Sequence, residues 1–155
     1  MCGPAETGKG SFVRAESLAS ARSGRRRLEL RVGAAPKEVS HVRNALRELG
    51  LPPALRDDAC LLVSELVTNS IRHAGLSLRD QVRIRAEWSG TKLRVDVYDR
   101  AAPIPLRVAG SIRPPPGAES GWGLFLVDRL ASRWGTLPGR HWFELEFQER
   151  QPRSA

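Results

Sequence analysis

The sequence has few of the residues that build disulfide frameworks or metal centres. Among its 155 residues there are only 2 cysteines and 3 histidines. Cys2 and Cys60 are too few for a disulfide framework, and together with His41, His73 and His141 they show no metal-ligand spacing. Cys60 lies among apolar residues at helical spacing, which predicts a small buried thiol rather than a reactive one.

Long apolar runs are also missing. No run approaches the ~20 residues that a transmembrane helix needs, and the N-terminus lacks the apolar segment of a secretory signal. Hydrophobic residues make up 41% of the chain and charged residues 27%, which is typical of a globular domain in water. We therefore expect one cytoplasmic domain without a membrane partner.

The positive charge of the chain raises nucleic acid as a partner, since the formal net charge is +8. However, residues 1–27 carry six basic and two acidic side chains, and residues 149–155 add two arginines and one glutamate. Most of the excess therefore lies at the two ends of the chain. This distribution makes nucleic acid an unlikely partner, but a basic nucleic-acid-binding domain stays open as an alternative.

The composition divides the chain into three parts. Residues 1–26 are rich in Gly, Ser, Ala and Arg and lack periodicity, which predicts a flexible basic N-terminal arm. Residues 27–148 carry the regular patterns and form one folded domain, and residues 149–155 form a C-terminal tail.

Periodicity within the folded part predicts its elements. Alternating apolar and polar residues predict strands at 28–32, 82–86, 93–97, 134–137 and 142–147. Helical spacing with Pro and Gly punctuation predicts helices over 36–50, over 54–75 and after Gly121. Residues 100–120 carry five prolines and no pattern, which predicts a long loop. This order indicates an α+β fold, a mostly antiparallel mixed sheet with about three helices on one face.

The first of three polar motifs lies on the second predicted helix. Glu65, Asn69 and His73 recur every four residues, so they share one helix face. A carboxylate and an amide one turn apart can activate a hydroxyl and hold a metal ion. The same spacing is also common on solvated helix faces.

The second and third motifs follow later in the chain. Asp99 ends an alternating strand, where it can accept a hydrogen bond from an amine such as that of adenine, or form a turn. Gly121 and Gly123 precede an apolar helix that continues with Leu124. Glycine lets a ligand approach the backbone, and a helix N-terminus attracts phosphate, although a plain helix entry looks the same.

Taken together in this order, the three motifs resemble the N, G1 and G2 boxes of the GHKL superfamily of Bergerat-fold ATPases, which includes gyrase, histidine kinases and MutL-type ATPases. The resemblance covers residues 28–148. The short form and the closing Trp142–Leu145 are similar to anti-sigma-factor serine kinases and to the single-domain regulatory ATP-binding proteins of actinobacteria. It implies that 27–148 is a histidine-kinase-like ATPase domain, a Bergerat-type α/β sandwich.

The resemblance also implies roles for single residues, with ATP and Mg²⁺ as cofactors. Glu65 is implied as the catalytic base, Asn69 as the metal ligand, Asp99 as the acceptor for the adenine amine, and residues 100–120 as the lid over ATP. The residues implied in nucleotide binding are Asn69, His73, Asp99, Ala101, Gly121, Gly123 and Leu124.

The activity implied by the resemblance is that of an ATP-dependent serine/threonine protein kinase. Such a protein phosphorylates an anti-anti-sigma-factor partner, and it also acts as an anti-sigma factor that binds a sigma factor and so regulates transcription. A homodimer is compatible with the resemblance. One departure matters: the family usually has glycine two residues after the acid of the G1 box, where this chain has Ala101. A catalytically weak pseudokinase that binds its partner without turnover therefore stays open as an alternative.

Overall fold

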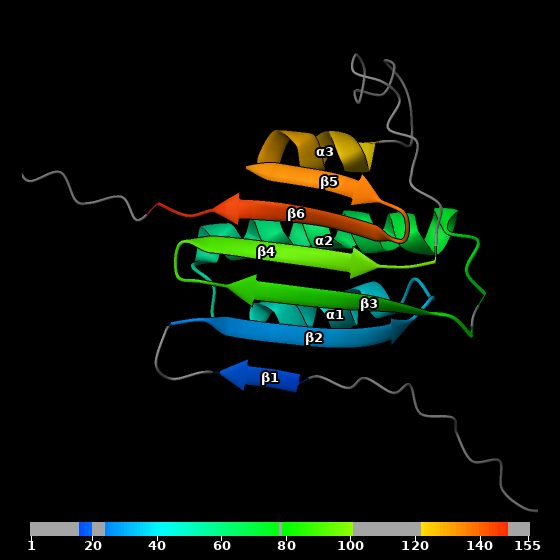
Figure 1. Cartoon of the computed structure of the whole chain (residues 1–155), viewed down its shortest axis with the longest axis horizontal. Coiled ribbons are helices and arrows are strands. Elements are labelled where there is room, and N and C mark those ends of the chain that lie inside the picture. The colour runs from blue at the N-terminus through cyan, green and yellow to red at the C-terminus, as the bar shows by residue number, and fades with distance from the viewer. Residues whose placement is uncertain (1–15, 20–23, 78, 101–121, 149–155) are drawn as a thin grey trace, which may run out of the picture.

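The computed structural model describes residues 16–19, 24–77, 79–100 and 122–148. Within these residues the chain forms three helices and six strands (Figure 1). In chain order they are β1 (Glu16–Ala19), β2 (Arg26–Gly33), α1 (Glu38–Arg47), α2 (Pro53–His73), β3 (Gln81–Trp88), β4 (Lys92–Tyr98), α3 (Trp122–Leu130), β5 (Arg133–Leu137) and β6 (Arg140–Glu146).

The strands form one sheet in the order β1-β2-β3-β4-β6-β5, and every pairing between them is antiparallel. The helices lie on one face of this sheet (Figure 1). Helix α2 contacts α1 on one side and α3 on the other, and it also packs on β3, β4 and β6. The predicted α+β class, with three helices on one face, is confirmed.

The core lies between the helices and the sheet. Strand alternation directs every second side chain toward the helices, so Leu28, Leu30 and Val32 of β2 are buried while Arg27 and Arg31 are exposed. On α2 the apolar residues at helical spacing, Leu55, Ala59, Leu62 and Leu66, are buried, and Cys60, Val63 and Val67 are buried beside them. The buried stripe is wider than one helix face usually is because α2 has a neighbouring helix on each side. None of the described helices has the length and hydrophobicity needed to cross a bilayer.

Strand β1 is the one element that the sequence did not predict. It lies within the segment expected to be a flexible arm and pairs with β2 at the edge of the sheet, with Leu18 opposite Arg27. Its sequence, Glu-Ser-Leu-Ala, does not alternate between apolar and polar residues, so it carries no strand pattern. The expected lid beyond Arg100 and the expected tail 149–155 lie outside the described residues.

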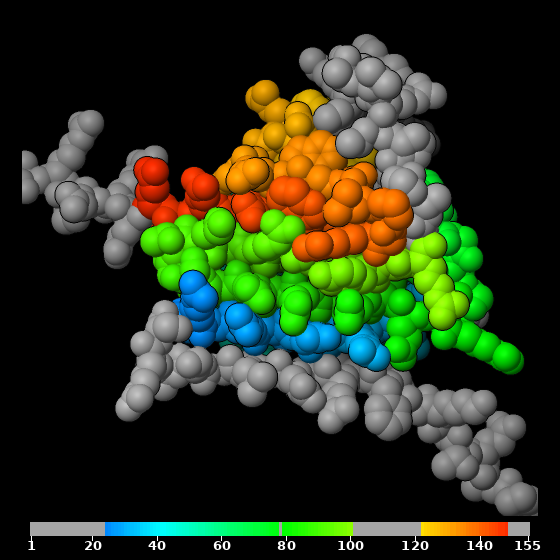
Figure 2. Space-filling view, viewed as in Figure 1, coloured from blue at the N-terminus to red at the C-terminus, as the bar shows by residue number. Residues whose placement is uncertain are grey.

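Figure 2 shows the face of the sheet that the helices leave uncovered. The strand register places rows of charged residues on this face. One row crosses five neighbouring strands and alternates in sign. Its members, each opposite the next in the strand register, are Arg27, Glu87, Arg94, Glu144 and Arg133. Opposite charges that face each other across strands stabilise the pairing by about 0.2–1 kcal/mol each.

A buried carboxylate lies in the middle of this open face. Asp96 is only 5% exposed. It accepts hydrogen bonds from Arg94 at 3.1 and 3.2 Å and from Arg140 at 2.8 and 2.6 Å. Arg94 also donates to Glu144 at 2.8 Å and stacks over the ring of Trp142. Burial lowers the pKa of Arg94, but its bonds to Asp96 and Glu144 outweigh that effect and raise the pKa above its ordinary value.

Candidate functional site

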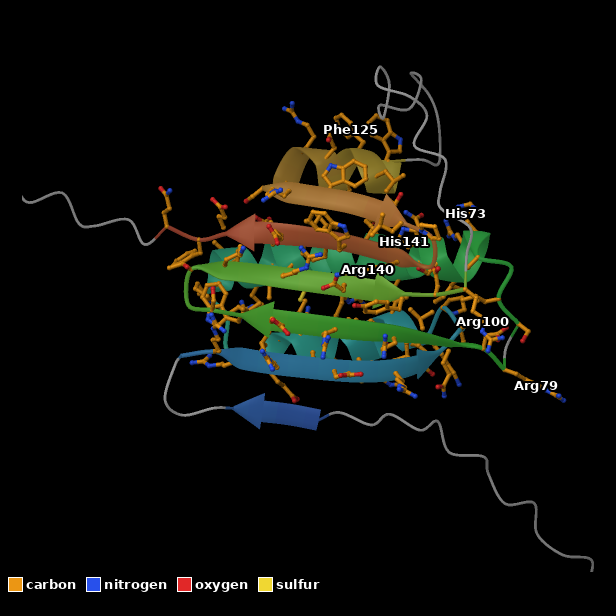
Figure 3. All side chains as sticks on the ribbon, in the orientation of Figure 1. His73, Arg79, Arg100, Phe125, Arg140 and His141 are labelled. Carbon is orange, nitrogen blue, oxygen red and sulfur yellow. The ribbon has the colours of Figure 1, made fainter. Side chains whose placement is uncertain are left out.

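Four chain segments meet at one end of the sheet. They are the C-terminal end of α2, the end of β4, the start of β6 and the N-terminal end of α3 (Figure 1). Figure 3 shows His73, Arg100 and His141 together at this end. The three motifs that the sequence singled out lie toward this end of the molecule, on the last turns of α2, just after β4 and on the first turn of α3.

Glu65 and Asn69 face the first turn of α3. A Cβ atom built on Gly123 would collide with the Oε2 atom of Glu65, and it would lie 3.3 Å from Glu65 Cδ and 3.5 Å from Asn69 Nδ2. The glycine thus allows α3 to approach these two side chains, both of which belong to half-buried residues. The structure brings the first and third motifs into direct contact.

The remaining predicted residues divide into two groups. His73 is the last residue of α2 and is exposed, while Leu124 of α3 is partly buried against the core. Ala101 and Gly121 lie outside the described residues.

Asp99 follows β4 directly and turns its side chain into the protein. Its backbone N–H donates to the carbonyl of Gly139 at 3.1 Å. Its side chain has 0% exposure, and its Oδ2 atom lies 3.3 Å from Nε2 of His141. His141 is itself 1% exposed and stands opposite Val97 in the register of β4 and β6. The strand register brings this histidine, 42 positions further along the chain, to ion-pair distance from the carboxylate, although the contact does not have hydrogen-bond geometry.

Sequence reasoning considered His141 only as a possible metal ligand and missed this contact. A signal was available, because strand alternation places His141 on the same face as Phe143 and Leu145, which are both buried. An ionisable residue on the inward face of a strand needs a polar partner. Ser70, also buried at this end of α2, has no hydrogen-bond partner for its hydroxyl within the described part of the chain.

The side chains at this end fit a nucleotide with a magnesium ion. Asn69 and Glu65 offer the amide and carboxylate oxygens that Mg²⁺ prefers. The described residues contain no group of three or more His, Cys, Asp or Glu that could hold a metal ion by themselves. Magnesium is commonly bound by one or two protein groups together with substrate phosphates, so these two side chains are enough for a site that a nucleotide completes.

The fold and the site first define the class, which is an α+β sandwich. Its helix α2 carries a carboxylate and an amide that contact α3, and a buried carboxylate follows strand β4. The match to protein families is more specific. Residues 17–136 match the histidine kinase-like ATPase domain, and the chain therefore belongs to this family. The family expected from the three motifs is confirmed.

Two further comparisons complete this result. Among solved structures, the chain is similar to the crystal structure of the RsbU and RsbW domains of Rv1364c from Mycobacterium tuberculosis, with a TM-score of 0.50 and 22% sequence identity. The match covers 76% of this chain and 31% of that chain, so this chain spans about a third of its length. This structural similarity supports the fold described above. No curated protein matches the sequence.

Proposed function

We propose that this chain is an ATP-binding regulatory domain that phosphorylates a serine or threonine of a small protein partner. The observation that carries the proposal is the contact of Glu65 and Asn69 with Gly123 at the first turn of α3. A carboxylate, an amide and a helix N-terminus lie side by side there, which supports the proposal, since phosphoryl transfer needs mainly positioning and charge neutralisation.

In this proposal each residue has a separate task. Asn69 holds the magnesium ion, which when bound neutralises phosphate charge. Asp99 accepts a hydrogen bond from the adenine amine, and Gly123 and Leu124 lie along the phosphates at the N-terminus of α3. His73 and Ala101, together with Gly121, complete the nucleotide-binding set that the sequence implies.

Glu65 carries the proton in the transfer step. The hydroxyl oxygen of the partner's serine forms a bond to the γ-phosphorus of ATP, and the bond from that phosphorus to the bridging oxygen breaks. ADP leaves, and the carboxylate of Glu65 takes the hydroxyl proton. The net result is that the phosphoryl group moves from ATP to serine and the proton moves to the carboxylate.

The partner class follows from two similarities. The motifs resemble those of anti-sigma-factor serine kinases, and the similar solved structure contains an RsbW domain. We therefore propose an anti-anti-sigma-factor protein as the substrate and a sigma factor as a second partner, with an effect on transcription. Cytoplasmic location and a homodimer belong to the same proposal.

One sequence feature favours a second candidate function, binding without turnover. Ala101 stands where the family usually has glycine, and the resemblance implies that its Cβ would hinder the approach of the backbone to adenine. In a pseudokinase of this kind the partner is gripped but not modified. Ala101→Gly should then strengthen ATP binding, since it removes that obstruction, and an unchanged affinity would count against an effect of this position.

The proposal is tested in two stages with the full chain. Calorimetry should detect ATP binding with Mg²⁺ and lose the signal when EDTA is added. A pull-down with the tagged protein and ATP, followed by phosphosite mapping, should then recover a small partner phosphorylated on serine or threonine. ATP binding with an unmodified partner would support the pseudokinase, and no binding at millimolar ATP would reject the kinase.

A further inference from the structure

A hollow lies at the opposite end of the sheet from the candidate functional site. It has a volume of about 210 Å³, room for roughly seven waters. Its walls come from the start of β2, the end of β3 and the start of β4, which lie side by side at that end (Figure 1). Rigid strands therefore fix its shape, and Trp88, which is 6% exposed, gives it an apolar wall.

The lining of this hollow is strongly basic. Its charged residues are Arg25, Arg26, Arg27, Lys92, Arg94 and Glu87. Five cations thus surround the space with a single carboxylate among them. The three arginines are consecutive in the sequence, so their positive charges lie close together and repel one another.

Two of the arginines have no carboxylate partner in the described part of the chain. Arg26 donates through Nη1 to the carbonyl oxygens of Leu49 at 3.1 Å and Gly50 at 2.7 Å, which anchors its guanidinium group but leaves its charge uncompensated. Arg25 forms no hydrogen bond or ion pair with any described residue, and it is exposed.

The other cations are compensated to different degrees. Arg27 lies 3.4 Å from Glu87, with both side chains about half exposed. Lys92 lies 3.8 Å from Glu144, a loose contact for a side chain that is 47% exposed. Only Arg94 is fully engaged by carboxylates, through Asp96 and Glu144. An anion in the hollow would therefore meet at least three cations that are free to reorient toward it.

We propose that this hollow, which we call the basic pocket, binds a phosphoryl group. Arginine matches phosphate geometry through parallel N–H donors, and Arg25 and Arg27 of the lining offer such donors. The size suits a phosphate or diphosphate rather than a whole nucleotide. The phosphoryl group comes either from a small phosphorylated molecule or from a phosphorylated side chain of another protein. This site is separate from the proposed kinase site and does not depend on it.

The test uses the ¹⁵N-labelled full chain and NMR titration at constant ionic strength. Inorganic pyrophosphate should shift the indole signal of Trp88 and the amides of residues 25–27 and 89–94 in a saturable manner. The indoles of Trp122, Trp134 and Trp142 serve as internal references. A phosphoserine peptide and its unphosphorylated form are titrated in the same way, and a lower dissociation constant for the peptide than for pyrophosphate would identify a protein-borne source.

Two variants with the same change in charge make the test specific. Arg25→Gln combined with Lys92→Gln should weaken pyrophosphate binding at Trp88 by at least about tenfold, since each charged hydrogen bond contributes about 1.5–3 kcal/mol. Arg79→Gln combined with Arg129→Gln removes two exposed cations that do not line the pocket, and it should bind like the wild type. Equal weakening in both variants, or no saturable shift at Trp88, would overturn the proposal.

Discussion

The imidazole Nε2 of His141 lies 3.3 Å from the carboxylate Oδ2 of Asp99, and neither side chain is more than 1% exposed. A carboxylate in such a place needs polar contacts to offset its lost hydration. His141 thus helps to hold the residue that we propose as the adenine acceptor, although it belongs to a strand that carries none of the family motifs.

This contact leads to a stability prediction. His141→Ala should lower the free energy of unfolding by about 2–4 kcal/mol, because it removes a polar partner from a buried carboxylate and leaves a cavity. Urea denaturation followed by circular dichroism measures it. His141→Gln keeps an amide donor, so it should lower the free energy of unfolding by clearly less. Equal stability of the alanine variant and the wild type would contradict the role given to this contact.

The pair on α2 gives a prediction that separates binding from transfer. Asn69→Ala should abolish Mg²⁺-dependent ATP binding in calorimetry. Glu65→Gln should bind ATP normally but transfer phosphate roughly 100-fold or more slowly, since positioned general bases commonly contribute that factor. Asn44→Ala, which changes an exposed amide on α1, is the control. If Glu65→Gln transfers phosphate at the wild-type rate, Glu65 is not the base.

The close approach of α3 to α2 can be tested at Gly123. Gly123→Ala adds a Cβ that pushes the Glu65 carboxylate aside, and we expect a roughly 10- to 100-fold slower phosphoryl transfer from this misplacement. Gly33→Ala is a matched control, because a Cβ there meets no atom within 4 Å. Kinetics of partner phosphorylation measure both. A folded Gly123→Ala protein with unchanged kinetics would show that Glu65 tolerates the shift.

The carboxylate on the open face should matter for stability rather than for ATP. Asp96→Asn leaves Arg94 and Arg140 without their shared partner. We expect a loss of about 2 kcal/mol, less than for a fully buried pair because Arg140 is 35% exposed. Asp57→Asn, at an exposed pair with Arg56, should change stability by less than about 0.5 kcal/mol. Chemical denaturation compares the two, and equal effects would refute the distinction.

Cys60 provides a chemical probe of the fold. Burial raises the pKa of its thiol, with nearby charges adding smaller effects, so little thiolate is present near neutral pH. In a Cys2→Ser protein, labelling by a disulfide reagent at pH 8 should be roughly 100-fold slower than in urea, because the thiolate must first become accessible. Equally fast labelling in both conditions would mean that Cys60 is not buried in solution.

Local patterns were sufficient to predict most of this fold. Helix α2 and the strand pairs β3–β4 and β5–β6 follow from spacing that is visible within a dozen residues. Each appears in the structure within a few residues of its expected bounds. Helix α1 is shorter than expected, since its first turn begins at Glu38 rather than at Pro36. The short strand β1 has no such pattern, because edge pairing with β2 defines it.

The candidate site, too, could be predicted only in part from the sequence. The four-residue spacing of Glu65 and Asn69 could be read from the sequence, but their contact with Gly123 depends on how α3 packs on α2. The contact of His141 with Asp99 depends on the register of β4 and β6. The same is true of the basic pocket, where Arg25 and Lys92 are 67 positions apart and meet only because three strands end together.

The alternating charges of the open face also bear on how the chain finds its native alignment. In the native hairpin of β3 and β4, Glu87 faces Arg94 and Arg85 faces Asp96. In one direction, a slip of two residues that keeps the apolar side chains inward would set Glu87 against Asp96 and Arg85 against Tyr98. Both opposite-charge pairs would be lost and two carboxylates would face each other, which is destabilising. The charge order thus discriminates against an alignment that hydrophobic burial alone would leave close in energy.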